Sequence, residues 1–525
     1  MHTHIPGTIG KFGNKKIKTR TSLLAQAIEN RERMSTKWRG DKKRGAGYAV
    51  NVAPFPMFRG TTKQTCGLNP WTAGNNVPRV GAPMGVHYDT LENIGCDPLS
   101  WHQAGLITNP SVAFMSSPSA GKSTAMRVMM RGMTAHGVKH MVIGDIKNEH
   151  GAQMKKDGGN HVVLAPGRGC LNVLDPGNIK DTIAKIYDKL GDSEEGRRCY
   201  ATVMADFHER RAELVQSLIA IQRGADLTGS EEAVIYASLR HMHETDPDNI
   251  PVLEDLRGFI KNPPNTIKDI VDWDEDETRY RDRVDNLRLD LAAVCRSGTL
   301  GAMFNGQTSV IDRDGNRTSE LDYDKGLVFD ISALRRSAPK LLAASYLVTW
   351  IVAFGLIETS HTLADFHVQN REQFAAWMEE FWLPLAASKG IVDRVNRVGR
   401  TNRTDGVAII FAVHTLNDFK SLPDAEDRAK AADMLSRCGM KWFGGLPRPE
   451  INDISENVTE LTSSAKNQLE EWNNPAFSDE DGLIPGRGCF AIVRADQPII
   501  PVRVLLTPTE LKQSLHDTDQ RLHAA

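Results

Sequence analysis

The sequence predicts an α/β fold in which a parallel-rich central sheet is interrupted by an all-helical insertion. The strands are indicated by short apolar runs, at residues 112–115, 140–144, 161–165, 326–330, 374–378 and 406–413. The insertion is indicated by helical spacing of apolar residues among many charges, at residues 194–223, 231–244 and 274–297. Apolar strands that alternate with helices are typical of a parallel sheet, which is covered on both faces.

A phosphate-binding loop is predicted where the run at 112–115 ends. The segment SSPSAGKST spans residues 116–124 and leads into a helical pattern from Ala125. A triphosphate needs close backbone N–H groups, a lysine charge, a hydroxyl for Mg²⁺ and the N-terminus of a helix. The candidate ligands are Ser117, Ser119, Ala120, Gly121, Lys122, Ser123 and Thr124. Ser116 stands where the usual pattern has glycine, which weakens the match and removes no phosphate ligand.

A pair of acidic residues, Glu379 and Glu380, follows the apolar run at 374–378. In ATP-hydrolysing sites one such carboxylate serves Mg²⁺ through water, and the other orients or deprotonates the attacking water. We assign Glu379, together with Ser123, to the metal, and Glu380 to the base. Asp330, at the end of another apolar run, is the rival, and the pair is preferred because it offers two adjacent carboxylates.

Other polar residues are expected near this site. Asp145, Lys147 and Glu149 follow the run at 140–144, and the carboxyl ends of parallel strands form the crevice in which ligands bind. His414 follows another strand, where its side chain is placed to sense a phosphate. Arginines three apart share one face of a helix and provide either a contact to a neighbour's phosphate or a basic surface: Arg394, Arg397, Arg400 and Arg403.

Composition limits the classes of protein to consider. A net charge of −2 over 525 residues does not indicate a protein that binds polyanions over its whole surface. The seven cysteines are far apart and form no Cys-x-x-Cys pair, which argues against a disulfide framework and a zinc ribbon, and favours a cytoplasmic setting. The uncharged segment 341–357 is interpreted as a buried core helix rather than a membrane span.

The expected organisation has six parts. Residues 1–47 are strongly basic and are interpreted either as a flexible arm for DNA or lipid or as a solvated tail, and residues 48–106 are interpreted as a small irregular lead-in. The remaining boundaries are a first part of the nucleotide domain at 107–177, the helical insertion at 178–297, a second part of that domain at 298–505 and a tail at 506–525.

The motifs, taken together, resemble the HerA/FtsK superfamily and most of all the VirB/TraC-type conjugation ATPases of type IV secretion systems. They occur in that family's order over about residues 85–505: SSPSAGKST, VIGDIKNEHG, LNVLDPG, GTLGAMFNGQT, EEFW, RTDGVAIIFAVH and MLSRCGMKWFGG. The resemblance implies a RecA-like ATPase domain with an inserted helical bundle. It also implies a hexamer that couples hydrolysis of ATP with Mg²⁺ to translocation of DNA or protein.

By the same resemblance, Glu379 and Glu380 match the family's Asp-Glu pair, Arg403 matches an arginine ahead of the next strand, and His414 stands where a glutamine is usual. The implied partners are other copies of the chain and inner-membrane components of a secretion channel. The implied location is cytoplasmic and peripheral, at the inner face of the cell membrane. Two alternatives stay open, a translocase that acts directly on DNA and an assembly scaffold that binds ATP without turnover.

Overall fold

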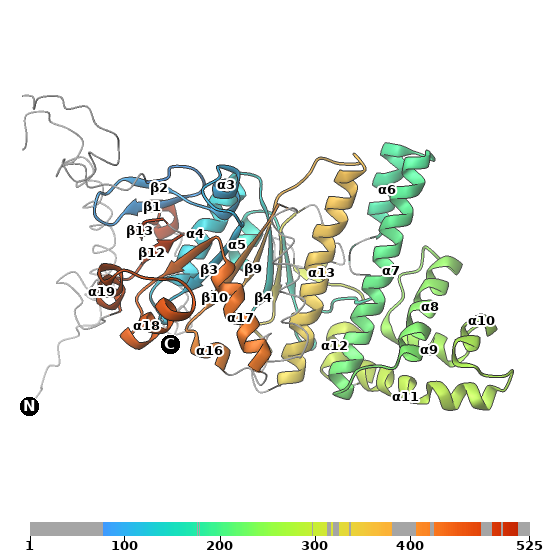
Figure 1. Ribbon diagram of the computed structural model, residues 1–525. Helices are drawn as coiled ribbons and strands as arrows, with labels where there is room; N and C mark the ends of the chain where they lie inside the picture. Colours follow the sequence, from blue (N-terminus) through green and yellow to red (C-terminus); the bar gives the residue numbers. More distant parts are fainter. Residues whose placement is uncertain are drawn as a thin grey trace, which may run out of the picture.

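The computed structural model describes residues 77–175, 177, 179–296, 298–311, 317–318, 325–334, 338–380, 406–420, 425–473, 486–494 and 497–512. They form one 13-stranded sheet, flanked by helices, with a helical region at one end (Figure 1). The strands are β1 Pro83–His87, β2 Asn93–Gly95, β3 Ser111–Met115, β4 Lys139–Asp145, β5 Asn160–Val163, β6 Val310–Ile311, β7 Arg317–Thr318, β8 Leu327–Asp330, β9 Phe374–Met378, β10 Val407–Val413, β11 Met440–Phe443, β12 Cys489–Val493 and β13 Ile500–Val504.

The middle of the sheet is parallel, in the order β11-β3-β10-β9-β4-β8-β5. Antiparallel strands extend both sides, with β12, β13, β1 and β2 beyond β11, and β6 and β7 beyond β5. The α/β class and the parallel core expected from the sequence are therefore confirmed. Residues 83–95, which were expected to lie in an irregular lead-in, differ from that expectation because they add β1 and β2 to the same sheet.

The helices cover both faces of the sheet and build the helical region. They are α3 Pro98–Gln103, α4 Lys122–Ala135, α5 Gly151–Lys156, α6 Ile179–Leu190, α7 Glu194–Arg223, α8 Gly229–Thr245, α9 Leu253–Lys261, α10 Asn265–Lys268, the 3₁₀ helix η1 Asp269–Val271, α11 Glu277–Arg296, α12 Leu300–Phe304, α13 Pro339–Asp365, α16 Asn417–Lys420, α17 Ala425–Arg437, α18 Arg448–Asn457, α19 Ser463–Trp472 and α20 Pro508–Lys512.

Strand β3 shows how the two faces are filled. Ala113 and Met115 are buried in the hydrophobic cluster that contains α13, whereas Val112 and Phe114 are buried in the cluster that contains α4. Successive residues of a strand point to opposite faces, so a strand that is buried on both sides must be apolar throughout. This is why the central strands appear in the sequence as uninterrupted apolar runs.

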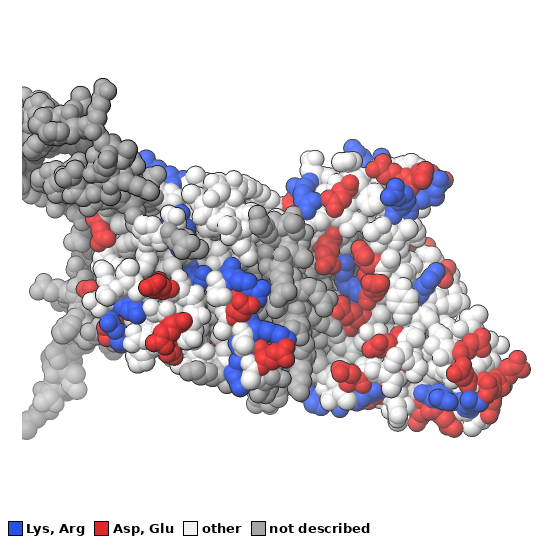
Figure 2. Space-filling model, viewed as in Figure 1, with Lys and Arg blue, Asp and Glu red and all other residues white. Residues whose placement is uncertain are grey.

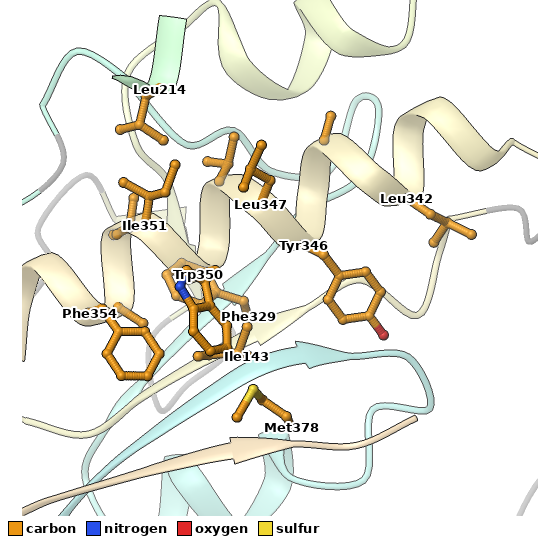
Figure 3. Packing of buried hydrophobic residues seen from close by; sticks show 14 of the residues in the cluster. Ile143, Leu214, Phe329, Leu342, Tyr346, Leu347, Trp350, Ile351, Phe354 and Met378 are labelled. Carbon is orange, nitrogen blue, oxygen red and sulfur yellow. The ribbon is translucent and has the colours of Figure 1, made fainter. Parts of the chain in front are cut away.

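Helix α13 forms the core between the sheet and the helical region. Figure 3 shows Tyr346 and Trp350 on the side of β4 and β8, and Ile351 beneath Leu214 of α7. The helix is long and apolar enough to cross a membrane, but 94% of its most apolar window is buried within the protein. The sequence-based interpretation as a buried core helix agrees with this packing.

The helical region is built on α7, which packs along α13 (Figure 1). Ser193 caps its N-terminus by accepting a hydrogen bond from the N–H of Gly196, and Gly224 ends it in a left-handed conformation. One expectation differs: a break was predicted over residues 251–264, but α9 lies there. The prolines at both ends of that stretch mark helix boundaries, because proline interrupts the interior of a helix and not its flanks.

Candidate nucleotide site

The loop at residues 116–121 connects β3 to α4 and is held from behind by the C-terminal part of the chain. The N–H of Ser117 donates to the carbonyl of Gly445 at 3.0 Å, and the hydroxyl of Ser117 donates to Oδ1 of Asn473 at 2.7 Å. The N–H of Gly488 donates to the carbonyl of Ala120 at 2.8 Å. These hydrogen bonds fix the shape of the loop.

Gly121, which precedes α4, requires the absence of a side chain. Its φ is +100°, and a Cβ there would come within 3.2 Å of the backbone nitrogen of Gly488. Since Gly121 also offers no side-chain cap, the first turn of α4 keeps free donors. Among the described residues, the N–H groups of Lys122, Ser123 and Thr124 have no backbone acceptor. These donors suit a phosphate at the helix N-terminus.

Ser116 is accommodated at the position where glycine is usual. Its side chain is fully buried, and its φ is not in the left-handed region, so the position does not need glycine for conformational reasons. The space is provided by Gly444, where a Cβ would come within 2.7 Å of the Cβ of Ser116. The side chain of Ser116 therefore fits because its neighbour Gly444 has none.

Lys122 is directed toward the end of β10. Its ammonium donates to the carbonyl of Val413 at 2.9 Å and to Nδ1 of His414 at 3.2 Å. Burial lowers the pKa of Lys122 to about 8, against the opposing effect of Glu380 and Glu379. Because β10 lies between β3 and β9, His414 is placed between the lysine of the loop and the acidic pair.

Glu380 is bound by two basic side chains. Its Oε1 lies 3.1 Å from Nε2 of His414 and 2.9 Å from Nζ of Lys147. Since Nδ1 of His414 accepts from Lys122, the hydrogen-bond pattern assigns the ring proton to Nε2, which donates to Glu380. Burial raises the pKa of this carboxyl, but His414 and Lys147 outweigh burial and hold the pKa well below its usual range. Glu380 has a φ of +49°, a strained value that sets the direction of its side chain after β9.

Glu379 is paired with a histidine that the sequence analysis did not single out. Nε2 of His150 lies 2.9 Å from Oε1 of Glu379, and both side chains are buried. Burial lowers the pKa of His150 and Glu379 raises it, with a net increase. Burial raises the pKa of Glu379 and His150 lowers it, with a net decrease. The pair is therefore ionic, and it fixes one oxygen of Glu379.

Asp145, at the end of β4, organises the segment that carries these basic side chains. Its carboxylate accepts hydrogen bonds from the N–H groups of Lys147 at 3.3 Å, Glu149 at 3.1 Å and His150 at 2.9 Å. Three such bonds to one buried carboxylate hold residues 146–150 in one conformation. That conformation presents Lys147 to Glu380 and His150 to Glu379.

Glu149 adds a third carboxylate beside the start of α4. Burial raises its pKa, as does the nearby charge of Glu379, while a hydrogen bond from Ser123 opposes the increase. Its Oε2 is buried and has no hydrogen-bond partner among the described residues. A buried acceptor without a partner, beside a hydroxyl and a second carboxylate, is chemistry that fits Mg²⁺, whose preferred ligands are oxygens.

Asp330, the rival acidic residue, lies elsewhere. It ends β8, which is separated from β9 by β4. Its carboxylate is bound to Nε2 of His161 at 3.2 Å and to the N–H of Ser332 at 2.9 Å. Burial raises the pKa of Asp330, but these hydrogen bonds lower it overall. The structure thus brings Lys122 together with Glu379 and Glu380, and not with Asp330.

The arginines predicted to act on phosphate or DNA lie outside the described residues, as does the basic arm at 1–47. These arginines are Arg394, Arg397, Arg400 and Arg403.

His150 was not predicted as a site residue because an isolated histidine in a charged run carries no local signal. Its position after a strand that ends in Asp145 was the clue available, since Lys147 and Glu149 were expected in the same crevice for that reason.

Comparison with known proteins identifies the fold. No protein-family model matches the chain, and no curated protein matches it in sequence. Among solved structures, the chain is similar to VirB4 of Thermoanaerobacter pseudethanolicus, with 16% identity over 84% of this chain and 99% of that one, and a TM-score of 0.55. The plasmid coupling protein TrwB in complex with an ATP analogue matches at 10% identity over 83% of this chain and 96% of that one. Its TM-score of 0.43 is too low to support the assignment of the fold. The chain therefore has the fold of VirB4, as the resemblance in its motifs predicted.

Proposed function

We propose that this protein is an ATP-hydrolysing motor of a conjugative or type IV secretion-like apparatus, which couples hydrolysis of Mg-ATP to translocation of DNA or protein. The observation that carries the proposal is the chain of contacts from Lys122 through His414 to Glu380, at the carboxyl edge of a parallel sheet. Lys122 follows β3, Glu380 follows β9, and His414 follows β10, which lies between these two strands. A phosphate-binding lysine and a candidate base are the parts that phosphoryl transfer requires. The fold shared with VirB4 supports the choice of motor.

Each side chain has a role in binding. Lys122 and the free N–H groups of the first turn of α4 hold the outer phosphates of ATP, supported by the loop residues Ser117, Ser119, Ala120 and Gly121. The hydroxyls of Ser123 and Thr124 lie at the same helix end. Ser123 and Glu379, the latter through water, would hold Mg²⁺, with Glu149 beside them. When bound, the metal neutralises negative charge on the phosphates.

The chemical step is assigned to Glu380. The ionised carboxylate accepts a proton from a water molecule, the water oxygen forms a bond to the γ-phosphorus, and the bond to the bridging oxygen breaks. ADP leaves with the electron pair of that bond. His414 links Glu380 to Lys122, so the position of the base is tied to the lysine that binds phosphate.

The assembly and its location follow the resemblance to the conjugation ATPases. We infer a homo-hexamer at the cytoplasmic face of the inner membrane, in contact with inner-membrane components of a secretion channel. Arg403 would reach the γ-phosphate of a neighbouring subunit in that assembly. We also propose that the helical insertion spans residues 178–297 and that the ATPase domain consists of the parts on either side of it.

A translocase that acts directly on DNA is the second candidate. Its support is the basic composition of residues 1–47 and the spacing of Arg394, Arg397 and Arg400. On the face shown in Figure 2, the described residues carry acidic and basic side chains in alternation, with no continuous basic stripe over the helical region. The support for a DNA contact is therefore the composition of the arm and of the arginine cluster, and not the described surface of this face.

The test is steady-state ATP hydrolysis by the full chain and by Lys122→Ala and Glu380→Gln, with and without single- and double-stranded DNA. We expect Lys122→Ala to lose ATP binding and turnover. Glu380→Gln should keep ATP binding and lose turnover by at least about a hundredfold, because a general base contributes about 10²–10⁴-fold. Binding of ATP without turnover by the unaltered chain would establish the scaffold, and stimulation by DNA would favour the DNA motor.

A further inference from the structure

The two lysines of the site are bound in different ways. Lys122 donates to uncharged acceptors, the carbonyl of Val413 and the imidazole of His414, so its positive charge is not neutralised by direct contact. Lys147 instead forms an ion pair with Glu380 at 2.9 Å. The candidate base therefore carries a cation directly on one of its two carboxylate oxygens, Oε1.

Lys147 is anchored at its backbone, while its ammonium can change partners. Its N–H donates a hydrogen bond to the carboxylate of Asp145, a buried residue at the end of β4. Its side chain is 36% exposed, whereas that of Glu380 is 11% exposed. A lysine ammonium is a point charge on a flexible stem, so it can reorient without a change in the backbone. Burial alone lowers the pKa of Lys147, but Glu380 raises it, so the side chain stays a cation.

A triphosphate brings a stronger anion to the same space. Its terminal phosphate carries more negative charge than a carboxylate near neutral pH and offers three acceptor oxygens. Lys122 and Lys147 lie on the two sides of the His414–Glu380 pair, so a phosphate held by Lys122 is a competing partner for Lys147. A diphosphate held in the loop lacks the group that extends toward Glu380.

We propose that Lys147 is a further catalytic residue of this site, which leaves Glu380 and binds the terminal phosphate when a triphosphate is present. This inference rests on the proposed ATPase function. Two consequences follow from one movement. The phosphate gains a second cation, which stabilises the charge that develops as the phosphoryl group is transferred. Glu380 loses its ion pair with Lys147, so a contact that competes with the attacking water at this carboxylate is removed.

The experiment compares triphosphate and diphosphate in the full-length protein. Lys147→Met removes the charge, Lys147→Arg keeps it, and Lys156→Met, on the exposed end of α5, is the matched control. Dissociation constants are measured for ADP and for a non-hydrolysable ATP analogue with MgCl₂ present, and hydrolysis of ATP is measured in single turnover. Thermal melting confirms that each variant is folded.

We expect Lys147→Met to weaken the ATP analogue about tenfold and to slow single-turnover hydrolysis about tenfold or more, with ADP affinity changed less than about twofold. Lys147→Arg should restore part of the preference for the triphosphate. Equal loss of ADP and analogue, or hydrolysis that is unchanged or faster in Lys147→Met, would overturn the proposal. If Lys122→Ala leaves nucleotide binding intact, the proposed function itself fails, and that outcome is distinguishable because it does not involve Lys147.

Discussion

At the scale of single residues, His150 is expected to act on the metal through Glu379. A histidine that is hydrogen-bonded to a metal-associated carboxylate fixes its orientation, and the loss of such a partner commonly costs about 10–100-fold in metal affinity. We predict that His150→Phe raises the Mg²⁺ concentration for half-maximal hydrolysis about tenfold. His150→Gln, which can still donate to Glu379, should lie closer to the unaltered protein.

The measurement is ATP hydrolysis as a function of Mg²⁺, with nucleotide affinity in the absence of metal as the second readout. His136→Phe is the matched control, since His136 follows the end of α4 and its side chain is 46% exposed. A merely structural role for His150 would lower thermal stability and leave the Mg²⁺ dependence unchanged. That result would remove His150 from the site.

The residues of the site differ in how far the sequence could predict them. Lys122 and the pair Glu379 and Glu380 were proposed because each belongs to a short local motif with a clear chemical purpose. His150 was not, because its contact with Glu379 spans 229 positions of the sequence and depends on three hydrogen bonds to Asp145. A contact that is made by the tertiary fold leaves no pattern in the neighbouring sequence.

At the scale of elements, the parallel strands and the antiparallel strand at 489–493 were predicted, whereas β1 and β2 at the outer edge were not. The central strands are buried on both faces and are recognisable as apolar runs. Strand β1 is only partly buried, and β2 has three residues, so neither produces such a run. Gly85 adds to the difficulty, since a Cβ there would come within 2.1 Å of the carbonyl oxygen of Arg503 in β13. In a sequence, a glycine is commonly interpreted as a sign of a turn, whereas Gly85 lies where two strands pair closely.

The packing of α7 against α8 predicts a response to acid. The guanidinium of Arg211 donates to Nδ1 of His208 at 2.6 Å. Burial, with the charges of Arg211, His243 and Arg240 against that of Glu244, lowers the pKa of His208 to about 4. In the unfolded chain the pKa is about 6.5. Between these values the unfolded state binds more protons, so the free energy of unfolding should fall as pH is lowered from 6.5 toward 4.

His208→Asn tests this response, because an asparagine oxygen can accept from Arg211 and cannot be protonated in this range. We expect the urea midpoint, followed by the helical circular dichroism signal, to fall less between pH 7 and pH 5 in His208→Asn than in the unaltered protein. His367→Asn is the control, since His367 is exposed and has a φ of +57°, which asparagine tolerates. The same pH dependence in His208→Asn and the control would show that His208 is not the titrating group.

At the scale of the whole molecule, the proposed ring predicts that two inactive variants can rescue each other. Lys122→Ala would have a defective nucleotide site and an intact Arg403, whereas Arg403→Ala would have the reverse. If Arg403 acts on a neighbour's nucleotide, a mixed assembly contains interfaces at which both parts are intact. For random mixing of equal amounts, roughly a quarter of the interfaces should have this composition and should hydrolyse ATP.

The measurement is ATP hydrolysis by each variant alone and by the two variants mixed before assembly. We expect each alone to be nearly inactive, the mixture to regain a fraction of turnover near that quarter, and Arg403→Ala alone to bind ATP almost normally. Mixing Lys122→Ala with Glu380→Gln is the matched control, because both variants have a defective nucleotide site and no combination of subunits repairs it. An inactive mixture of Lys122→Ala and Arg403→Ala whose assemblies are shown by native mass spectrometry to contain both chains would place the action of Arg403 within its own subunit.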